Sequence, residues 1–400
     1  MKTAYVEFRP ASLVATRLLG RVFPSIYFSR VGLLHVADAP PPPLPAPNWV
    51  RLRNRACGIC GSELHLVFGR GDLGIAPAAL PGNLRQYLGH ELVGEVVEVG
   101  SAVRALRPGD RVVQQKGRSC LSYGVADPCP SCREGNYSRC QREPELGPSQ
   151  LGGGWSEQCV VPEGQLFPIP PDLSDHEAVL LEPAACGVRA ALRCPPRPGE
   201  RVLIFGAGTM GFFTLQAARA AQPSCYTVVI VQFPFQEDMA RRLGADEVWR
   251  TTDDIYERTA RLTGARLHRG PLGNRMLLGG FDVVYDCVGK SSTLGRALRL
   301  TRAGGTVVLV GVELHPLTVD LTPVWHQEVN LAGTVAHGQE DFEGQSISTY
   351  DLTLRWWREG KLTFDGFVTH RFPLDRLREA LMAAADKKGS HSVKVVLEIG

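Results

Sequence analysis

The sequence has no apolar run of the length that a transmembrane helix needs, and neither sign of charge dominates it. Charged residues make up 21% of the 400 residues, and the formal net charge is only +3. A charge this small does not favour nucleic acid or a membrane surface as a partner, so we expect neither. Residues 1–10 lack the hydrophobic core and the cleavage site of a secretory signal, and we expect none there.

The cysteines do not form the even set that a disulfide framework requires. There are 11 of them, and several are clustered at the spacing of metal ligands. This usage favours reduced thiols, and we therefore expect a cytoplasmic protein. The length of 400 residues exceeds the range in which one hydrophobic core keeps growing, so the sequence predicts two domains.

What the sequence does contain is a dense group of metal-ligating and proton-transferring residues at 56–65 and 88–91. Cys60 and His90 offer a thiolate and an imidazole, two ligands that a catalytic zinc ion takes from proteins. Glu91 adds a carboxylate as a further ligand. Ser62 and His65 follow Cys60 closely enough to pass a proton from the site to solvent.

The run Gly-Ile-Cys-Gly-Ser-Glu-Leu-His at residues 58–65, followed by Gly-His-Glu at 89–91, resembles the catalytic zinc signature of the medium-chain dehydrogenase/reductase family. Within that family it is similar to the alcohol, polyol and threonine dehydrogenase branch. The resemblance extends from about Trp49 to the C-terminus. One residue departs from the signature, because Glu63 stands where the family has Asp. The longer side chain is expected to reposition the groups around the zinc.

The resemblance also implies a role for Glu182, in the run Leu-Leu-Glu-Pro at 180–183. In the polyol and threonine dehydrogenases, a Glu-Pro at this point places a carboxylate near the catalytic zinc. The implied site is therefore Cys60, His90, Glu91 and Glu182, and which glutamate binds zinc directly is left open. A Glu before Pro at the start of a helix is also an ordinary capping arrangement.

A second group of cysteines has the spacing of a structural zinc site. Cys129 and Cys132 are followed by Cys140, but the first cysteine of the family's pattern would fall three residues before Cys129, where this chain has Ala126. Cys120 or Asp127 could replace the missing ligand. The sequence therefore predicts a structural zinc held by Cys120, Cys129, Cys132 and Cys140, with a metal-free lobe as the alternative.

A dinucleotide-binding turn opens the second half of the chain. Residues 201–205 are apolar and β-branched, residues 212–221 are predicted to be helical, and a Gly-x-Gly-x-x-Gly run lies between them. These glycines let the backbone approach a pyrophosphate at the helix N-terminus. The predicted cofactor-binding residues are Gly206, Gly208, Thr209, Met210 and Gly211, and the resemblance adds the backbone at Val288 and Val310, which meets the nicotinamide in the family.

The choice of dinucleotide depends on the end of the next strand, Val-Val-Ile-Val at 228–231. An acid about 20 residues past the glycine-rich turn normally accepts a hydrogen bond from the ribose of NAD. Here the residue is Gln232, which can donate to the ribose of either cofactor. Arg241 and Arg242, in the following helix, are interpreted as surface charges. We expect dual use of NAD and NADP, with a modest preference for NADP.

These patterns together predict an α/β fold with two domains. Short alternating strands between Gly and Pro-Gly turns, at residues 92–113, indicate a small β-barrel-like domain, which the resemblance identifies as GroES-like. The second domain is predicted to be a Rossmann domain with a doubly wound parallel sheet. The predicted boundaries are 1–184 for the catalytic domain, 185–343 for the Rossmann domain, and 344–400 for the return to the catalytic domain.

The resemblance implies a zinc-dependent oxidoreductase that transfers a hydride between an alcohol or polyol and NAD(P). In it, Cys60, His90, Glu91 and Glu182 surround the metal while Ser62 and His65 carry the proton away. Alcohols, polyols and amino alcohols are the expected substrates, and a homodimer or homotetramer is the expected assembly. The alternatives are a zinc-independent NADPH reductase of the same fold and a non-enzymatic nucleotide- or zinc-binding protein. The loop at residues 69–86 is expected to form one wall of the substrate pocket.

Overall fold

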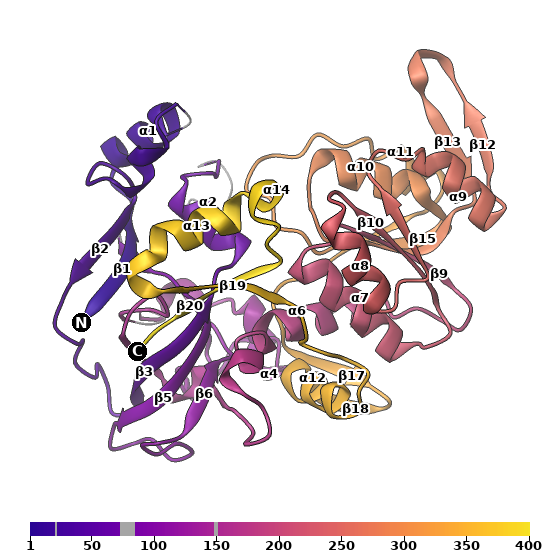
Figure 1. The fold of residues 1–400 in the computed structure, drawn as a ribbon. Coiled ribbons are helices and arrows are strands. Elements are labelled where there is room, and N and C mark those ends of the chain that lie inside the picture. Colours follow the sequence, from indigo (N-terminus) through magenta and orange to yellow (C-terminus); the bar gives the residue numbers. More distant parts are fainter. Residues whose placement is uncertain (21, 73–84, 148–150) are drawn as a thin grey trace. The chain divides into compact units, whose positions relative to one another are not determined.

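The computed structural model describes residues 1–20, 22–72, 85–147 and 151–400, and it divides into two compact units (Figure 1). The first unit is Met1–Glu182 with Phe364–Gly400, and the second is Pro183–Thr363. The greater part of the loop predicted as a pocket wall lies outside the described residues. No helix in the described ranges is long and apolar enough to cross a membrane.

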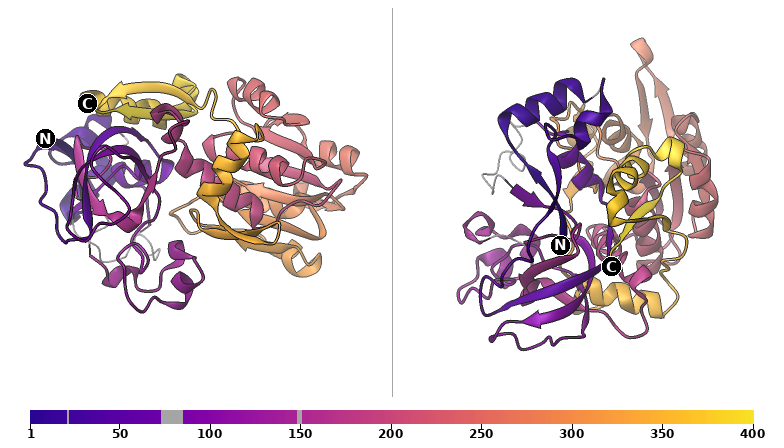
Figure 2. Two further views of the ribbon diagram at one scale, coloured as in Figure 1. Left: turned by 90° about the horizontal axis from the view of Figure 1, so that it is seen from below. Right: turned by 60° about the vertical axis from the view of Figure 1, so that its left-hand side comes forward.

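The first unit is built on a seven-stranded sheet whose strands come from both ends of the chain. The order is β19-β20-β3-β5-β6-β8, with β7 also paired to β3. The strands are β3 (Trp49–Gly58), β5 (Glu91–Val99), β6 (Arg111–Gln114), β7 (Gln158–Pro162), β8 (Leu166–Pro168), β19 (Val368–Pro373) and β20 (Lys394–Glu398). Figure 2 shows the yellow C-terminal strands beside the purple strands of the same unit. The predicted GroES-like fold of this unit is confirmed, and C-terminal strands pair with its sheet.

Short helices and a small second sheet surround this core. The sheet has the order β2-β1-β4, and helix α2 follows β3 directly. The elements are β1 (Lys2–Glu7), α1 (Pro10–Leu19), η1 (Pro24–Phe28), β2 (Leu34–Asp38), α2 (Gly61–Val67), β4 (Arg85–Tyr87), α4 (Pro130–Arg133), η2 (Tyr137–Arg139), η3 (Glu143–Glu145), η4 (Glu163–Gln165), α5 (Asp175–Ala178), η6 (Leu374–Arg376), α13 (Leu377–Ala385) and α14 (Lys387–Ser390).

Helix α1 was not predicted, and its burial explains why. The residues it buries are Ser12 and Thr16, whereas Val14, Leu18 and Leu19 are exposed. Sequence reasoning looks for an apolar face that points to the core. In α1 the inward face is polar, so the usual periodicity is missing.

The second unit contains a six-stranded parallel sheet in the order β11-β10-β9-β14-β15-β16. Numbered from β9, this is the 3-2-1-4-5-6 order of a Rossmann domain, so the predicted doubly wound sheet is confirmed. The strands are β9 (Arg201–Phe205), β10 (Tyr226–Val231), β11 (Glu247–Arg250), β14 (Phe281–Asp286), β15 (Thr301–Leu309) and β16 (Asn330–Gly333). Their apolar side chains are buried because helices α7 (Thr209–Ala221), α8 (Phe235–Arg242) and α10 (Ser291–Leu300) pack against the sheet.

Two hairpins extend this unit beyond the sheet. Residues 262–280, for which the sequence predicted no role, contain the first of them, and the second precedes helix α12. The elements are α6 (Leu181–Leu192), α7 (Thr209–Ala221), α8 (Phe235–Arg242), α9 (Ile255–Thr263), β12 (Arg266–Arg269), η5 (Pro271–Gly273), β13 (Arg275–Leu278), α10 (Ser291–Leu300), α11 (Thr322–His326), β17 (Gln339–Phe342), β18 (Gln345–Ser348) and α12 (Thr349–Arg358).

The last return to the first unit begins at Phe364, whereas the sequence placed the domain boundary at residue 344. Helix α12 accounts for the difference. It belongs to the second unit, where the Trp356 ring packs edge-on against Phe342 at a centroid distance of 5.4 Å.

Candidate functional site

The predicted metal ligands Cys60, His90 and Glu91 come from the adjacent ends of two paired strands. Strands β3 and β5 are antiparallel, and Gly58 is in register with Glu91. Cys60 lies just past the end of β3, and His90 lies just before β5. The pairing therefore brings together two segments that are thirty residues apart in the sequence.

Cys60, His90 and Glu91 each offer a ligand atom, and these atoms lie within 4.8 Å of one another. Cys60 and His90 are partly buried, and Glu91 is buried. A thiolate and an imidazole fit zinc by ligand type, so the donor set is chemically suited to this ion. Glu182, in the first turn of α6, is not in this group, and its role as a ligand stays a prediction.

Glu63 holds the histidine of this group. Its Oε1 accepts hydrogen bonds from Nδ1 of His90 at 3.0 Å and from the Gly89 backbone at 2.6 Å, and its Oε2 accepts one from the Cys60 backbone at 3.0 Å. With Nδ1 donating to the carboxylate, Nε2 is the ring nitrogen for a metal. Burial lowers the pKa of His90, but the opposing charges of Glu63 and Cys60 outweigh it and hold that pKa well above the ordinary value.

From the sequence, Glu63 was identified only as a departure from the family signature. The signal that identifies its role is its position three residues after Cys60, which is the N-cap of α2. An acid at this position reaches back to the N-cap backbone in a capping box. The longer Glu side chain makes this contact and the contact with His90 at the same time.

Lys394 holds the carboxylate of Glu91. Its Nζ donates to both oxygens of Glu91, at 2.6 and 2.7 Å, and both side chains are almost fully buried. Burial lowers the pKa of Lys394, but the charges of Glu91, Cys60 and Glu182 outweigh it, so the pKa is raised. Both oxygens of Glu91 are therefore engaged by an ammonium group. Sequence reasoning missed Lys394 because 303 residues separate it from Glu91.

Gly58 leaves room for the Glu91 carboxylate, and a methyl group there should weaken the metal site. A Cβ on Gly58 would lie 1.8 Å from Oε2 of Glu91. We expect Gly58→Ala to displace this carboxylate and to lower zinc affinity by about 10- to 100-fold. Zinc retention during dialysis against a graded chelator measures this. Gly61→Ala is the control because a Cβ there meets nothing within 4 Å, and equal retention in both variants would contradict the prediction.

Ser62 and His65 both lie on α2 and are partly buried. The Ser62 hydroxyl donates to the Cys60 sulfur at 3.2 Å. Nδ1 of His65 is 3.2 Å from the backbone oxygen of Arg70. The helix thus places Ser62 against Cys60, a predicted metal ligand, and His65 near its C-terminal end. The transfer of a proton through Ser62 and His65 stays a prediction.

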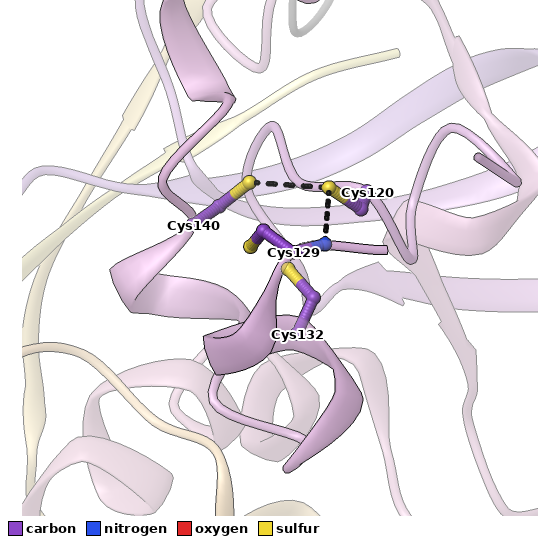
Figure 3. A group of neighbouring side chains, drawn as sticks. All are labelled: Cys120, Cys129, Cys132 and Cys140. Carbon is purple, nitrogen blue, oxygen red and sulfur yellow. Dashed lines mark hydrogen bonds between the residues drawn. The ribbon is translucent and has the colours of Figure 1, made fainter. Parts of the chain in front are cut away.

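The four cysteines of the predicted structural lobe lie together, with their sulfur atoms within 4.8 Å of one another (Figure 3). All four are free thiols, and the sulfurs of Cys120 and Cys140 are 3.7 Å apart. Of the two replacements considered for Ala126, Cys120 joins the group. Asp127 is 87% exposed and paired with Arg133. Four cysteines in this arrangement match the ligand set of a structural zinc site.

Backbone amides also point at these sulfurs. Cys129 donates its N–H to Sγ of Cys120 at 3.5 Å, and Gln141 donates to Sγ of Cys129 at 3.4 Å. The Gln141 amide lowers the pKa of Cys129 to about 6, whereas burial raises the pKa of Cys132 to about 12. The lobe therefore already stabilises one thiolate by hydrogen bonds.

In the second unit, the glycine-rich turn joins β9 to α7 as predicted. Gly206 has a φ of +94°, and a Cβ on Gly211 would lie only 1.7 Å from the Gly206 oxygen. Side chains at these positions would separate the helix from the strand. Gly208 is the N-cap of α7, and Thr209 and Met210 form its first turn. The N-terminus of a helix that follows such a turn can bind a pyrophosphate.

The end of β10 is organised by Gln236, a residue that the sequence did not single out. Its Oε1 accepts hydrogen bonds from the backbones of Gln232 and Phe233, both at 3.0 Å, and its Nε2 donates to the Ala207 oxygen at 2.8 Å. Gln232 is exposed, and so are Arg241 and Arg242 at the other end of α8.

Val288 and Val310 are brought together by Asp286, at the end of β14. The Asp286 side chain accepts from the Val288 backbone at 3.0 Å, and its backbone oxygen accepts from the Val310 backbone at 2.9 Å. Asp286 is fully buried, and burial raises its pKa although backbone amides act against the shift. This buried acid was also missed, because nothing in the sequence separates it from an ordinary strand residue.

Comparisons with known proteins agree with the GroES-like fold of the first unit and the Rossmann fold of the second. Residues 46–171 match the alcohol dehydrogenase GroES-like domain, and residues 209–350 match the zinc-binding dehydrogenase domain. The chain is 32% identical over 359 residues to L-idonate 5-dehydrogenase of Vitis vinifera, covering 88% of each protein. It is 31% identical over 358 residues to sorbitol dehydrogenase of Arabidopsis thaliana, covering 89% of this chain and 90% of that one. The crystal structure of 2R,3R-butanediol dehydrogenase from Bacillus subtilis is similar, with a TM-score of 0.71, 26% identity, and 92% and 96% coverage.

The fold and the two family matches are those of a dinucleotide-linked, zinc-binding dehydrogenase. The chain belongs to the zinc-dependent alcohol and polyol dehydrogenases of the medium-chain dehydrogenase/reductase family. It is an oxidoreductase that transfers a hydride between an alcohol or polyol and NAD(P), and its cofactors are zinc and NAD(P). The resemblance drawn from the signature is confirmed, and the two alternatives, a zinc-independent reductase and a non-enzymatic protein, are not supported.

Proposed function

We propose that this enzyme oxidises a secondary hydroxyl group of a polyol or a polyol acid at a zinc ion held by Cys60 and His90, with Glu91 and Glu182 beside it. The observation that carries the proposal is the group of Cys60, His90 and Glu91. Glu63 is hydrogen-bonded to His90, and Lys394 to Glu91. Relatives named as L-idonate and sorbitol dehydrogenases support this substrate class. When bound, zinc supplies a Lewis acid that stabilises negative charge on a substrate oxygen.

The chain's own residues then have separate tasks. Glu63 orients the ring of His90, and Lys394 orients the carboxylate of Glu91, through hydrogen bonds within the protein. Ser62 and His65 are proposed to take the hydroxyl proton toward solvent. A panel of polyols, aldonic acids, simple alcohols and amino alcohols, assayed by nicotinamide absorbance with zinc quantified, tests the proposal. Turnover of simple alcohols alone would contradict the substrate class.

The relay gives a prediction for His65→Ala. Without the ring, the proton must leave through water, so we expect kcat near neutral pH to fall by roughly 100-fold. Small exogenous bases such as imidazole should restore part of the rate. The pH profile of kcat, with and without imidazole, is the measurement. A variant with the rate and pH profile of the parent would show that His65 has only a structural role.

For the dinucleotide, we propose binding at Gly206, Gly208, Thr209, Met210 and Gly211, with Gln232 at the ribose and Val288 and Val310 at the nicotinamide. We expect dual use with a modest preference for NADP, because Gln232 is uncharged and the nearby Glu237 carboxylate is paired with Arg250. Measurements of kcat/KM with both cofactors decide this. A preference for NAD of a hundredfold, or about 2.7 kcal/mol, would contradict it.

We also propose that the enzyme works in the cytoplasm as a homodimer or homotetramer. All 11 cysteines are free, which supports a reducing compartment. Sedimentation of the purified protein tests the assembly, and a monomer at working concentration would contradict it.

A further inference from the structure

The segment between β1 and β2 packs against the end of helix α2, which carries the proposed proton-transfer residues Ser62 and His65. Helix α1 and the turn η1 precede residues 46–171, which match the family domain. Thr16 is fully buried, and its methyl group lies 3.2 Å from where a Cβ on Gly69 would stand. The ring of Tyr27 packs edge-on against Phe68 at 4.8 Å. The described parts of this N-terminal segment, residues 10–20 and 22–28, therefore cover the turn that follows α2.

Arg17 of α1 binds the backbone of that turn. Its Nε donates to the Gly69 oxygen at 3.1 Å, and its Nη2 donates to the Gly71 oxygen. A guanidinium group is planar and presents its donors in a fixed fork, so it restrains both carbonyls together. Arg70, the residue between them, is thereby held from either side.

The Arg70 backbone in turn contacts both the backbone and the ring of His65. The Arg70 N–H donates to the His65 oxygen at 2.8 Å, and the Arg70 oxygen lies 3.2 Å from Nδ1 of the His65 ring. A carbonyl oxygen can only accept, so Nδ1 of His65 must carry the proton in this contact. In the neutral ring, Nε2 then carries the lone pair and is the nitrogen that can accept a proton.

We propose that Arg17 is a positioning residue for His65. By holding the Gly69 and Gly71 carbonyls, it presents the Arg70 oxygen to Nδ1 and fixes the orientation and tautomer of the ring. The inference rests on the proposed relay role of His65 and adds to it an anchor from outside the family domain. A purely structural Arg17 would affect stability and leave the ring unchanged.

The kinetic test uses the zinc-loaded enzyme with Arg17→Met, which keeps much of the aliphatic stem but removes the donors. We expect kcat near neutral pH to fall about tenfold, with zinc content and dinucleotide Kd unchanged, and imidazole to restore part of the loss. Arg17→Lys should lose less, because an ammonium group still donates to a carbonyl. Arg30→Ala, at an exposed arginine of the same region, is the control and should match the parent.

The spectroscopic test reads the ring directly. Long-range ¹H–¹⁵N spectra of protein labelled in its histidines report the tautomer, and His65→Gln identifies the His65 signals. The parent should show the Nδ1–H form, and Arg17→Met should show a mixture. If Arg17→Met does not fold, both readouts are taken from Arg17→Lys, where smaller changes in the same direction are expected.

A folded Arg17 variant that has the same His65 tautomer and the same kcat as the parent enzyme would overturn the inference. Its failure is distinguishable from failure of the relay. If His65→Ala leaves turnover unchanged, the relay is wrong, yet the tautomer comparison still shows whether Arg17 holds the ring.

Discussion

Replacing Cys60 by serine should remove one zinc equivalent and reduce kcat by roughly a thousandfold or more, because a Lewis acid contributes several kcal/mol to stabilising charge in such reactions. A serine hydroxyl is a poor zinc ligand compared with a thiolate. The rest of the support, from Glu63 to His90 and from Lys394 to Glu91, does not depend on the sulfur. Dinucleotide binding and folding should therefore be retained.

The measurements are zinc content, kcat and dinucleotide Kd on the same preparations. Cys194→Ser is the matched control, since this partly buried cysteine lies in the second unit, outside both groups of predicted metal ligands. It should keep both zinc and activity. Parent turnover in a Cys60→Ser variant that has lost the metal would contradict the zinc mechanism.

The second large effect is expected in the cysteine lobe. Cys120→Ser should remove the other zinc equivalent and lower the free energy of unfolding by about 3 kcal/mol or more, because metal binding here contributes to folding. Activity per folded chain should change much less than stability. Cys132→Ser should behave in the same way. Zinc analysis together with denaturant unfolding provides both numbers.

Asp127→Asn separates the two candidates for the missing ligand. The Asp127 side chain is exposed and paired with Arg133, so its neutralisation should leave zinc content at two per chain. Loss of zinc in Asp127→Asn with retention in Cys120→Ser would reverse the assignment. One zinc per parent chain, with no change of stability on substitution, would mean that the lobe is metal-free.

Much of the fold could be predicted because its signals are local. The glycine-rich turn, the apolar strands around it and the alternating strands of the first unit each specify their own conformation. Helix α1 could not be predicted, because it buries Ser12 and Thr16 instead of an apolar stripe. The hairpin of β12 and β13 lay in a stretch, residues 262–280, for which the sequence gave no expectation.

The proposed metal ligands could be named from the sequence, but the residues that hydrogen-bond to them could not. Cys60 and His90 are recognisable by residue type and order. Lys394 and Asp286 act through contacts that depend on strand pairing, and no local spacing marks them. Arg17 is still harder to identify from the sequence, because it acts on His65 only through the backbone of the turn that follows α2. Cys120 was one of two open candidates, since its distance from Cys129 matches no standard ligand spacing.

The most direct test of the central claim is polyol turnover during removal and return of zinc. Purified enzyme is assayed by nicotinamide absorbance with a polyol, then stripped with a chelator, and then titrated with zinc. Turnover should be lost when zinc is removed and should return to the parent rate when zinc is restored, while Cys60→Ser should not recover. Undiminished polyol oxidation by zinc-free protein would contradict the assignment of this chain's chemistry to Cys60, His90 and their metal.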